Sequence, residues 1–409
     1  MKCGLLGRKL GHSYSPQIHA FLGSYPYVLC EKEPEEVGNF LKYGDFSALN
    51  VTIPYKKDVI PYCGELSDTA KRMGAVNTIV RRHDNTLIGH NTDYFGFSSM
   101  VRKSGLDPAG KKVMVLGTGG ASNTAVVALK DMGADVVIIS HKDNTPENLA
   151  RHSDTKIIVN ASPEGMYPKN GTSPADLDLF PALEGILDMI YNPSRTKLLM
   201  DAEARNLITE NGLWMLVAQA KEAAEWFTGT SISDSVIAEI HNTLRSQMEN
   251  VVLIGMPGSG KSSIGKLLAQ RLNRKFADAD TTIEEIAGMP IPQIFAEFGE
   301  DAFRAWETRA LTELGKQSGL VIATGGGCIT RPENYPLLHQ NGTIVWLQRD
   351  LNLLPTDGRP LSQAGQLETM YKVRRLLYAK FADFTVINDK TPEEAAEQIA
   401  ALLNMEDVQ

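Results

Sequence analysis

Residues 255–262 read GMPGSGKS, which fits the pattern GxxxxGKS of a phosphate-binding loop. In such a loop the glycines let backbone N–H groups point at phosphate oxygens, while Lys261 would reach the terminal phosphates and Ser262 would ligate Mg²⁺. A strand of the buried type precedes the loop and an amphipathic helical pattern follows it, which disfavours a chance glycine loop. The sequence therefore predicts an ATP and magnesium site, with nucleotide contacts from Gly258, Ser259, Gly260, Lys261, Ser262 and Ser263.

Charged residues downstream of this loop could hold the molecule that receives phosphate. FADADTTIEEI places Asp278 and Asp280 two residues apart. If both end a strand, both carboxylates point the same way, one near Mg²⁺ and the other near an acceptor hydroxyl. The alternative is a solvated acidic loop. FGEDAFRAWETRAL places Arg304 and Glu307 on one helical face, which taken alone is most often a surface ion pair.

Three further stretches follow in the same part of the chain. VIATGGGCI ends a strand in three glycines, so a ligand could approach the backbone closely. LPTDGRPLSQAG is rich in glycine and proline around Arg359, as a mobile lid would be. Arg374 follows on the helical stretch YKVRRLLYAKFAD.

A second glycine-rich turn lies earlier, in VMVLGTGGAS, where strand, turn and helix form a dinucleotide-binding unit. Ser122 stands in the place of the third glycine, so a merely structural turn is the alternative. The next strand, DVVIIS, is followed by a cation where an NAD site wants a carboxylate, which favours the 2′-phosphate of NADP, although Asp143 argues the other way. The predicted NADP contacts are Gly117, Thr118, Gly119, Gly120, Ala121, Ser140, His141 and Lys142.

Polar residues gather at the ends of strand-like segments in the first hundred residues. They are Ser13 and Ser15 in GRKLGHSYSPQIHA, Asn50, Thr52 and Lys56 in LNVTIPYKK, Asn77 in AVNTIV and Asp93 in GHNTDYFGF. Each alone is more simply a helix cap or a solvated surface group. Together they favour a site for a polyhydroxylated ligand.

The composition narrows the class of protein. The chain has 409 residues, 43% hydrophobic and 22% charged, which predicts a globular protein of two or three domains. A formal net charge of −8 argues against a nucleic-acid partner. The four cysteines form no CxxC pair, which argues against a zinc site or a disulfide framework. With no signal peptide and no apolar run of roughly 18 residues, we expect a cytoplasmic address and no membrane partner.

Short β-rich runs alternate with helical patterns along the chain, which predicts an α/β fold with largely parallel sheets. We expect a substrate-binding lobe over 1–103 completed by 213–242, a Rossmann-like NADP-binding lobe over 104–212, a polar linker at 243–249, and a P-loop domain with a parallel sheet over 250–409.

The motifs of residues 250–405 come in one order: the phosphate loop, DxD, FRxxE, GGG, RPL and RxxLY. In this order the segment resembles the shikimate kinases. The resemblance implies that Asp280 orients the 3-hydroxyl of shikimate and that Lys261 and Arg359 stabilise the transferring phosphoryl group. This leaves Asp278, with Ser262 of the loop, as the expected Mg²⁺ ligands. It also implies shikimate contacts from Asp280, Arg304, Gly326 and Arg374. The lid stretch is shorter here than is usual in that family.

The motifs of residues 1–242 also come in one order: HSxSPxxH, NVTxPxK, AVNT, NTD, GxGGA, DMIYNP and GLWMLVAQA. This segment resembles the shikimate dehydrogenases, in which Asn-Arg-Thr usually stands where Ser140, His141 and Lys142 stand here. The resemblance implies that Lys56 and Asp93 form the acid–base pair and that Asp68, Met189, Tyr191 and Gly212 line the nicotinamide side. The implied substrate contacts are Ser13, Ser15, Thr52, Lys56, Asn77, Asp93, Tyr191 and Gln219.

The two resemblances imply a bifunctional enzyme that reduces 3-dehydroshikimate to shikimate with NADPH and then phosphorylates shikimate with ATP and Mg²⁺. One alternative is a quinate- or shikimate-type oxidoreductase that uses NAD, fused to a kinase of another small polyol. The other is that one half is a non-catalytic sensor. The intact residues Lys56, Asp93, Lys261, Ser262 and Asp280 count against a sensor.

Overall fold

The computed structural model describes residues 1–11, 13–354 and 364–406. It divides into two compact units, one of Met1–Tyr191 with Thr196–His241 and one of Asn192–Arg195 with Asn242–Gln409. The division falls within helix α9 (Ser235–Met248), so residues 243–248 of the expected linker are helical. Strands and helices alternate through both units, which confirms the predicted α/β class. No helix among the described residues is long and apolar enough to cross a membrane.

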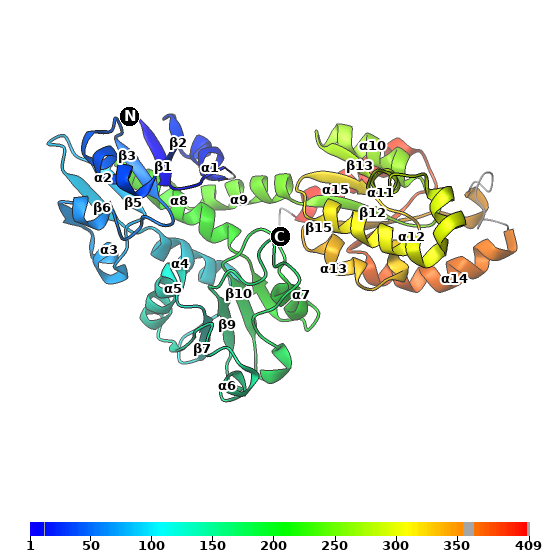
Figure 1. The fold of residues 1–409 in the computed structure, drawn as a ribbon, viewed down its shortest axis with the longest axis horizontal. Helices are drawn as coiled ribbons and strands as arrows, with labels where there is room; N and C mark the ends of the chain where they lie inside the picture. Colours follow the sequence, from blue (N-terminus) through cyan, green and yellow to red (C-terminus); the bar gives the residue numbers. More distant parts are fainter. Residues whose placement is uncertain (12, 355–363, 407–409) are drawn as a thin grey trace. The chain divides into compact units, whose positions relative to one another are not determined.

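The first unit contains a six-stranded mixed sheet in which only β5 runs antiparallel to its neighbours. The strand order is β2 (Tyr27–Glu31), β1 (Cys3–Gly7), β3 (Ala48–Val51), β5 (Thr78–Arg81), β6 (Leu87–His90) and β4 (Glu65–Leu66). The helices of this lobe are α1 (Ser15–Leu22), α2 (Pro34–Tyr43), α3 (Asp68–Met73), α4 (Asp93–Ser104) and α8 (Leu213–Thr228), with a short 3-10 turn at Ile60–Tyr62 (Figure 1).

The second sheet of this unit has five strands, all parallel. The order is β11 (Ile208–Glu210), β10 (Gly185–Asp188), β9 (Ile157–Asn160), β7 (Lys112–Leu116) and β8 (Asp135–Ile139), with helices α5 (Gly120–Asp131), α6 (Pro146–Ala150), α7 (Lys197–Glu203) and a 3-10 turn at Leu177–Leu179. In β7, Val113 and Val115 enter one apolar cluster while Met114 and Leu116 enter another. Both faces are therefore covered, which explains why this strand reads as a continuous apolar run.

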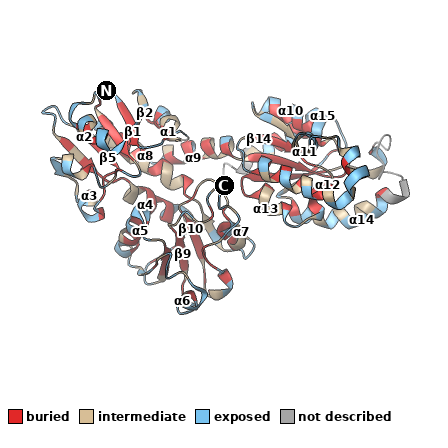
Figure 2. Cartoon of the chain, in the orientation of Figure 1, coloured by how far each residue is buried: buried red, intermediate tan, exposed pale blue. Residues whose placement is uncertain are grey.

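The second unit has one five-stranded parallel sheet. The order is β13 (Lys275–Asp278), β14 (Leu320–Ala323), β12 (Asn250–Ile254), β15 (Gly342–Gln348) and β16 (Phe384–Ile387), with helices α10 (Lys261–Arg271), α11 (Ala279–Ala287), α12 (Ile291–Gly315), α13 (Asn334–His339), α14 (Ala364–Phe381), α15 (Pro392–Glu406) and 3-10 turns at Cys328–Thr330 and Leu351–Leu353. Buried residues concentrate in the strands and exposed residues on the outer helix faces (Figure 2). The central strand β12 leads directly into the loop GMPGSGKS.

Candidate active sites

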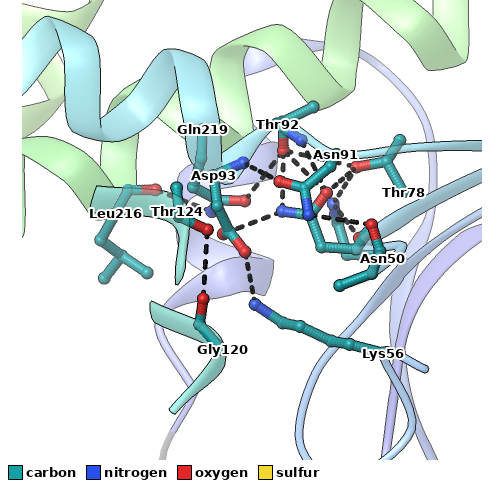
Figure 3. Close-up of polar contacts among 12 residues, drawn as sticks. Asn50, Lys56, Thr78, Asn91, Thr92, Asp93, Gly120, Thr124, Leu216 and Gln219 are labelled. Carbon is teal, nitrogen blue, oxygen red and sulfur yellow. Dashed lines mark hydrogen bonds and ion pairs between the residues drawn. The ribbon is translucent and has the colours of Figure 1, made fainter. Parts of the chain in front are cut away.

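Lys56 and Asp93 form an ion pair in the first unit. The Nζ atom of Lys56 lies 2.6 Å from Oδ2 of Asp93, and the two side chains point toward each other (Figure 3). The Lys56 side chain is 29% exposed and that of Asp93 is 15% exposed, so the pair is shielded but reachable by a ligand. A lysine held against a carboxylate can deliver a proton to a carbonyl oxygen and polarise that carbonyl.

The Asp93 carboxylate is held on its other side by the Asn77 amide, and the Asp93 backbone is held by Asn91. Asn77 Nδ2 donates to Asp93 Oδ1 at 2.9 Å, and the Asp93 backbone N–H donates to Asn91 Oδ1 at 3.0 Å. Asn77 is in turn fixed because its Oδ1 accepts the Thr92 N–H at 2.8 Å. Asp93 is also the first residue of α4, where helix N–H groups favour negative charge. These contacts fix the orientation of the carboxylate before any ligand binds.

A cavity of about 820 Å³ surrounds this pair. It brings together these residues that the sequence predicted for the site: Ser13, Ser15, Thr52, Lys56, Asn77, Asp93, Ala121, Met189, Tyr191, Gly212 and Gln219. Asn50 also lines it, with its Oδ1 accepting the Tyr27 hydroxyl at 2.7 Å. Asp68 is not among the lining residues; it begins α3, its side chain is 96% exposed, and it pairs with Lys71 at 3.4 Å.

Sequence reasoning missed several residues of the cavity wall. Ile53, Met166, Met215 and Leu216 line it, and a single apolar residue in a loop or helix carries no signal for a site. Lys9 lines it as well, from the loop after β1. The exposed Lys9 has no hydrogen bond or ion pair within the described ranges, whereas the other lining lysine, Lys56, is paired.

The glycine turn before α5 has the shape that a dinucleotide needs. Gly117 has φ 120°, and a Cβ there would lie 2.8 Å from the Ala161 carbonyl oxygen, so only glycine fits. A Cβ on Gly119 or Gly120 would meet no atom within 4 Å, so the helix N-terminus is open to a ligand. Ser122, in the place of a third glycine, donates from its hydroxyl to Gly117 O at 2.7 Å and ties the turn together.

The turn after β8 carries the expected hydroxyl and cations together with the carboxylate of Asp143. The Ser140 hydroxyl donates to the Asp143 carboxylate, and the Asp143 N–H donates to Ser140 O at 3.0 Å. His141 and Lys142 are exposed in the same turn. The turn therefore offers both a cation and a carboxylate beside Ser140.

The phosphate loop of the second unit has positive φ at Gly255, Gly258 and Gly260, as a backbone cradle requires. The Lys261 ammonium donates to the carbonyl oxygens of Gly255 at 2.9 Å and Met256 at 3.0 Å. Its side chain therefore lies along the loop, at the N-terminus of α10.

Asp278 and Asp280 do not share a strand, so the expected strand alternation is wrong. Strand β13 ends at Asp278, whose carboxylate accepts the Asp280 N–H at 3.1 Å and caps α11. Because Asp278 caps the N-terminus of α11, the chain is helical from Ala279 onward and strand β13 ends at Asp278. Asp278 Oδ2 also accepts the Ser262 hydroxyl at 2.7 Å. Burial raises the pKa of Asp280, and the nearby Asp278 adds to this shift.

Arg304 and Glu307 form a buried pair, which corrects the surface pair that their spacing suggested. Arg304 Nη1 donates to Glu307 Oε2 at 2.8 Å, and the side chains are 9% and 0% exposed. Burial raises the pKa of Glu307, against the opposing effect of Arg304. Arg304 also donates to Glu300 Oε1 at 3.1 Å.

The three glycines after β14 let Pro257 of the phosphate loop and Glu307 approach the backbone closely. A Cβ on Gly325 would lie 2.6 Å from Glu307 Oε1, and one on Gly326 would lie 2.7 Å from Pro257 of the loop. Arg374 Nη1 donates to Gly326 O at 3.2 Å. One region beside the phosphate loop therefore brings together Asp280, Arg304, Gly326 and Arg374. Arg359 lies outside the described residues.

The first unit is thus a two-lobed α/β unit with a dinucleotide-type turn and a Lys56–Asp93 ion pair, and the second is a P-loop phosphotransferase fold. Residues 5–79 match the family model of the shikimate dehydrogenase substrate binding domain, and residues 257–404 match that of shikimate kinase. The chain is 34% identical to the NADP(+) shikimate dehydrogenase of Clostridium beijerinckii, over 60% of this chain and 98% of that one. It is 42% identical to the shikimate kinase of Synechococcus, over 41% of this chain and 90% of that one. The chain belongs to both families, the shikimate dehydrogenases and the shikimate kinases.

Solved structures agree for the first unit. Shikimate dehydrogenase 1 from Peptoclostridium difficile matches with a TM-score of 0.54 and 38% identity, over 60% of this chain and 98% of that one. The shikimate 5-dehydrogenase of Thermus thermophilus, solved with NADP(H) and shikimate, matches with a TM-score of 0.54 and 28% identity, over 59% of this chain and 99% of that one.

Proposed function

We propose that this protein is a bifunctional enzyme of the shikimate pathway. Its first unit would reduce 3-dehydroshikimate to shikimate with NADPH, and its second would transfer phosphate from ATP to the 3-hydroxyl of shikimate. The observation that carries the proposal is the Lys56–Asp93 pair inside a cavity that also reaches the glycine turn at Ala121. The product of the first reaction is the substrate of the second.

The reduction needs a hydride, which NADPH supplies when bound, and a proton for the carbonyl oxygen. Lys56 would donate that proton, and Asp93 would hold the ammonium in place. Asn77, Thr52 and Gln219 line the same cavity and would bind the ring hydroxyls. Ser13, Ser15 and Tyr191 would contact the rest of the substrate.

The residues at the glycine turn fit a dinucleotide, because Gly119 and Gly120 leave open space at the N-terminus of α5. Lys142 and His141 fit the 2′-phosphate of NADP. The Asp143 carboxylate at Ser140 fits a ribose hydroxyl better. We therefore propose NADP as the physiological cofactor and measurable use of NAD.

In the second unit, Ser262 and Asp278 offer two oxygen atoms that would hold Mg²⁺ beside the phosphates of ATP. Mg²⁺ would neutralise charge on the transferring phosphate. Asp280 would accept a hydrogen bond from the 3-hydroxyl and orient it, while Arg304 and Arg374 would pair with the carboxylate of shikimate. Lys261, together with Arg359, would stabilise the phosphoryl group.

A coupled assay tests the proposal. Purified full-length protein receives 3-dehydroshikimate, NADPH, ATP and Mg²⁺, and the products are separated by chromatography. We expect shikimate 3-phosphate, and shikimate alone when ATP is left out. If neither product forms, the proposal is wrong. Parallel assays with NADH, quinate and gluconate separate it from an NAD-dependent catabolic oxidoreductase fused to another polyol kinase.

A further inference from the structure

Asp188 is a buried carboxylate that the reaction described above does not use. It ends β10, is 0% exposed, and has no ion pair within the described ranges. Three donors satisfy it: Asn160 Nδ2 and the Ile190 N–H reach Oδ1, each at 3.0 Å, and the Thr196 hydroxyl reaches Oδ2 at 2.7 Å. An unpaired buried carboxylate is costly, so its place in the fold calls for a reason.

The first donor connects Asp188 to the loop after β9. Asn160 Oδ1 accepts the Ser162 hydroxyl at 2.7 Å, and its Nδ2 also donates to Glu164 O at 3.2 Å. These two hydrogen bonds of Asn160 hold residues 160–164 in a tight turn. This loop leads directly to Met166, which lines the dehydrogenase cavity.

The second donor, the Ile190 N–H, connects Asp188 to a second stretch of chain that lines the same cavity. The Ile190 N–H is held by Asp188, and the Ile190 carbonyl accepts the Gly212 N–H at 3.0 Å. Gly212 is tightly placed, because a Cβ there would lie 2.1 Å from Met189 O. Met189, Tyr191 and Gly212 all line the cavity, whereas Asp188 does not.

We propose that Asp188 is a positioning residue of the dehydrogenase, whose carboxylate sets the two loops that form one wall of the cavity. This inference rests on the proposed function, since that wall carries the residues expected on the nicotinamide side. Asp188 acts through Asn160 and Ile190 and does not touch a ligand.

The test compares the Asp188→Ala and Asp188→Asn variants of the full chain. Asparagine can keep all three contacts, because its Oδ1 accepts from Asn160 and Ile190 while its Nδ2 donates to Thr196 Oγ1. NADP⁺ affinity is measured by calorimetry well below the unfolding midpoint of each variant, together with the KM for NADPH and the kinase rate.

We expect Asp188→Ala to weaken NADP⁺ binding by about tenfold with the kinase rate unchanged, and Asp188→Asn to bind NADP⁺ as tightly as the parent. Unchanged affinity in Asp188→Ala, or equal damage in both variants, would overturn the inference. If Asp188→Ala does not fold, Thr196→Val carries the test: about threefold weaker binding supports the inference and parental binding overturns it. A parent chain that neither binds NADP⁺ nor reduces 3-dehydroshikimate would instead refute the proposed function.

Discussion

Lys56 and Asp93 lie 37 positions apart in the chain, yet their charged atoms lie 2.6 Å apart at the edge of one cavity. Lys56 comes from the loop after β3 and Asp93 from the first turn of α4. Two separate elements must therefore be in place before the pair exists. Its geometry is set by the fold of the first unit.

Removing the proton donor should stop one reaction and spare the other. We expect Lys56→Ala to lower the dehydrogenase kcat roughly 10²- to 10⁴-fold, the usual contribution of a general acid. The kinase rate of the same preparation serves as the control, because the two sites lie in different units. Neighbouring Lys57, which is exposed and does not line the cavity, supplies a matched variant, Lys57→Ala, that should keep full activity.

The converse change lies in the phosphate loop. We expect Lys261→Ala to lower the kinase kcat by roughly 10²-fold or more, because a preorganised charge on the transferring phosphate is lost. The rate of 3-dehydroshikimate reduction should not change. If either Lys56→Ala or Lys261→Ala silenced both reactions in a folded protein, the two sites would not be independent.

The buried pair of α12 should matter for both stability and substrate affinity of the kinase. Glu307→Ala leaves the buried Arg304 guanidinium with only the exposed Glu300 as its ion-pair partner among the described residues. Loss of one member of a buried pair costs about 3–5 kcal/mol, so urea unfolding of the second unit should shift to lower concentrations. The KM for shikimate should rise because Arg304 loses its orientation. Glu307→Gln, which keeps an acceptor for Nη1, should be milder, and equal effects of the two variants would contradict this role.

Local motifs made the two nucleotide loops predictable. In each loop, a strand, a glycine turn and a helix follow one another within a few residues, so neighbouring residues determine the loop geometry. The α/β class followed from the same alternation. By contrast, no local pattern pairs Lys56 with Asp93, and only the resemblance to the dehydrogenases suggested that pair before the structure placed the two residues together.

Other features depend on tertiary packing and could not be predicted from the sequence. The i, i+3 spacing of Arg304 and Glu307 is the same on a surface helix as on a buried one, and only the packing of α12 distinguishes them. The end of β13 at Asp278 was missed because the capping role of that side chain competes with strand alternation. Asp188 opens the motif DMIYNP, but nothing in the sequence indicated that its carboxylate is buried, since an aspartate at the end of a strand most often faces solvent.

Lys9 should contribute to attraction of the substrate. It lines the cavity and has no partner in the part of the chain that the structure describes, while 3-dehydroshikimate carries a carboxylate. We expect Lys9→Ala to raise the KM for 3-dehydroshikimate up to about fivefold with kcat unchanged, the usual scale of an exposed ion pair. The effect should shrink at high ionic strength. Lys57→Ala removes the same charge away from the cavity, and an equal effect there would show that Lys9 acts only through net charge.

The titration of Asp188 should make the stability of the first unit depend on pH. Burial raises the pKa of Asp188 from 3.8 to about 6, so between these values the folded chain binds a proton that the unfolded chain has released. The free energy of unfolding should therefore fall as pH rises through this window, by on the order of 3 kcal/mol in all. Asp188→Asn cannot titrate and should lack this component. Hydrogen exchange of the amides in β9 and β10, compared between the parent and Asp188→Asn at about pH 5 and about pH 7, measures the difference. The advantage of the asparagine variant should grow with pH, and an advantage that stays constant would show that Asp188 does not titrate in this range.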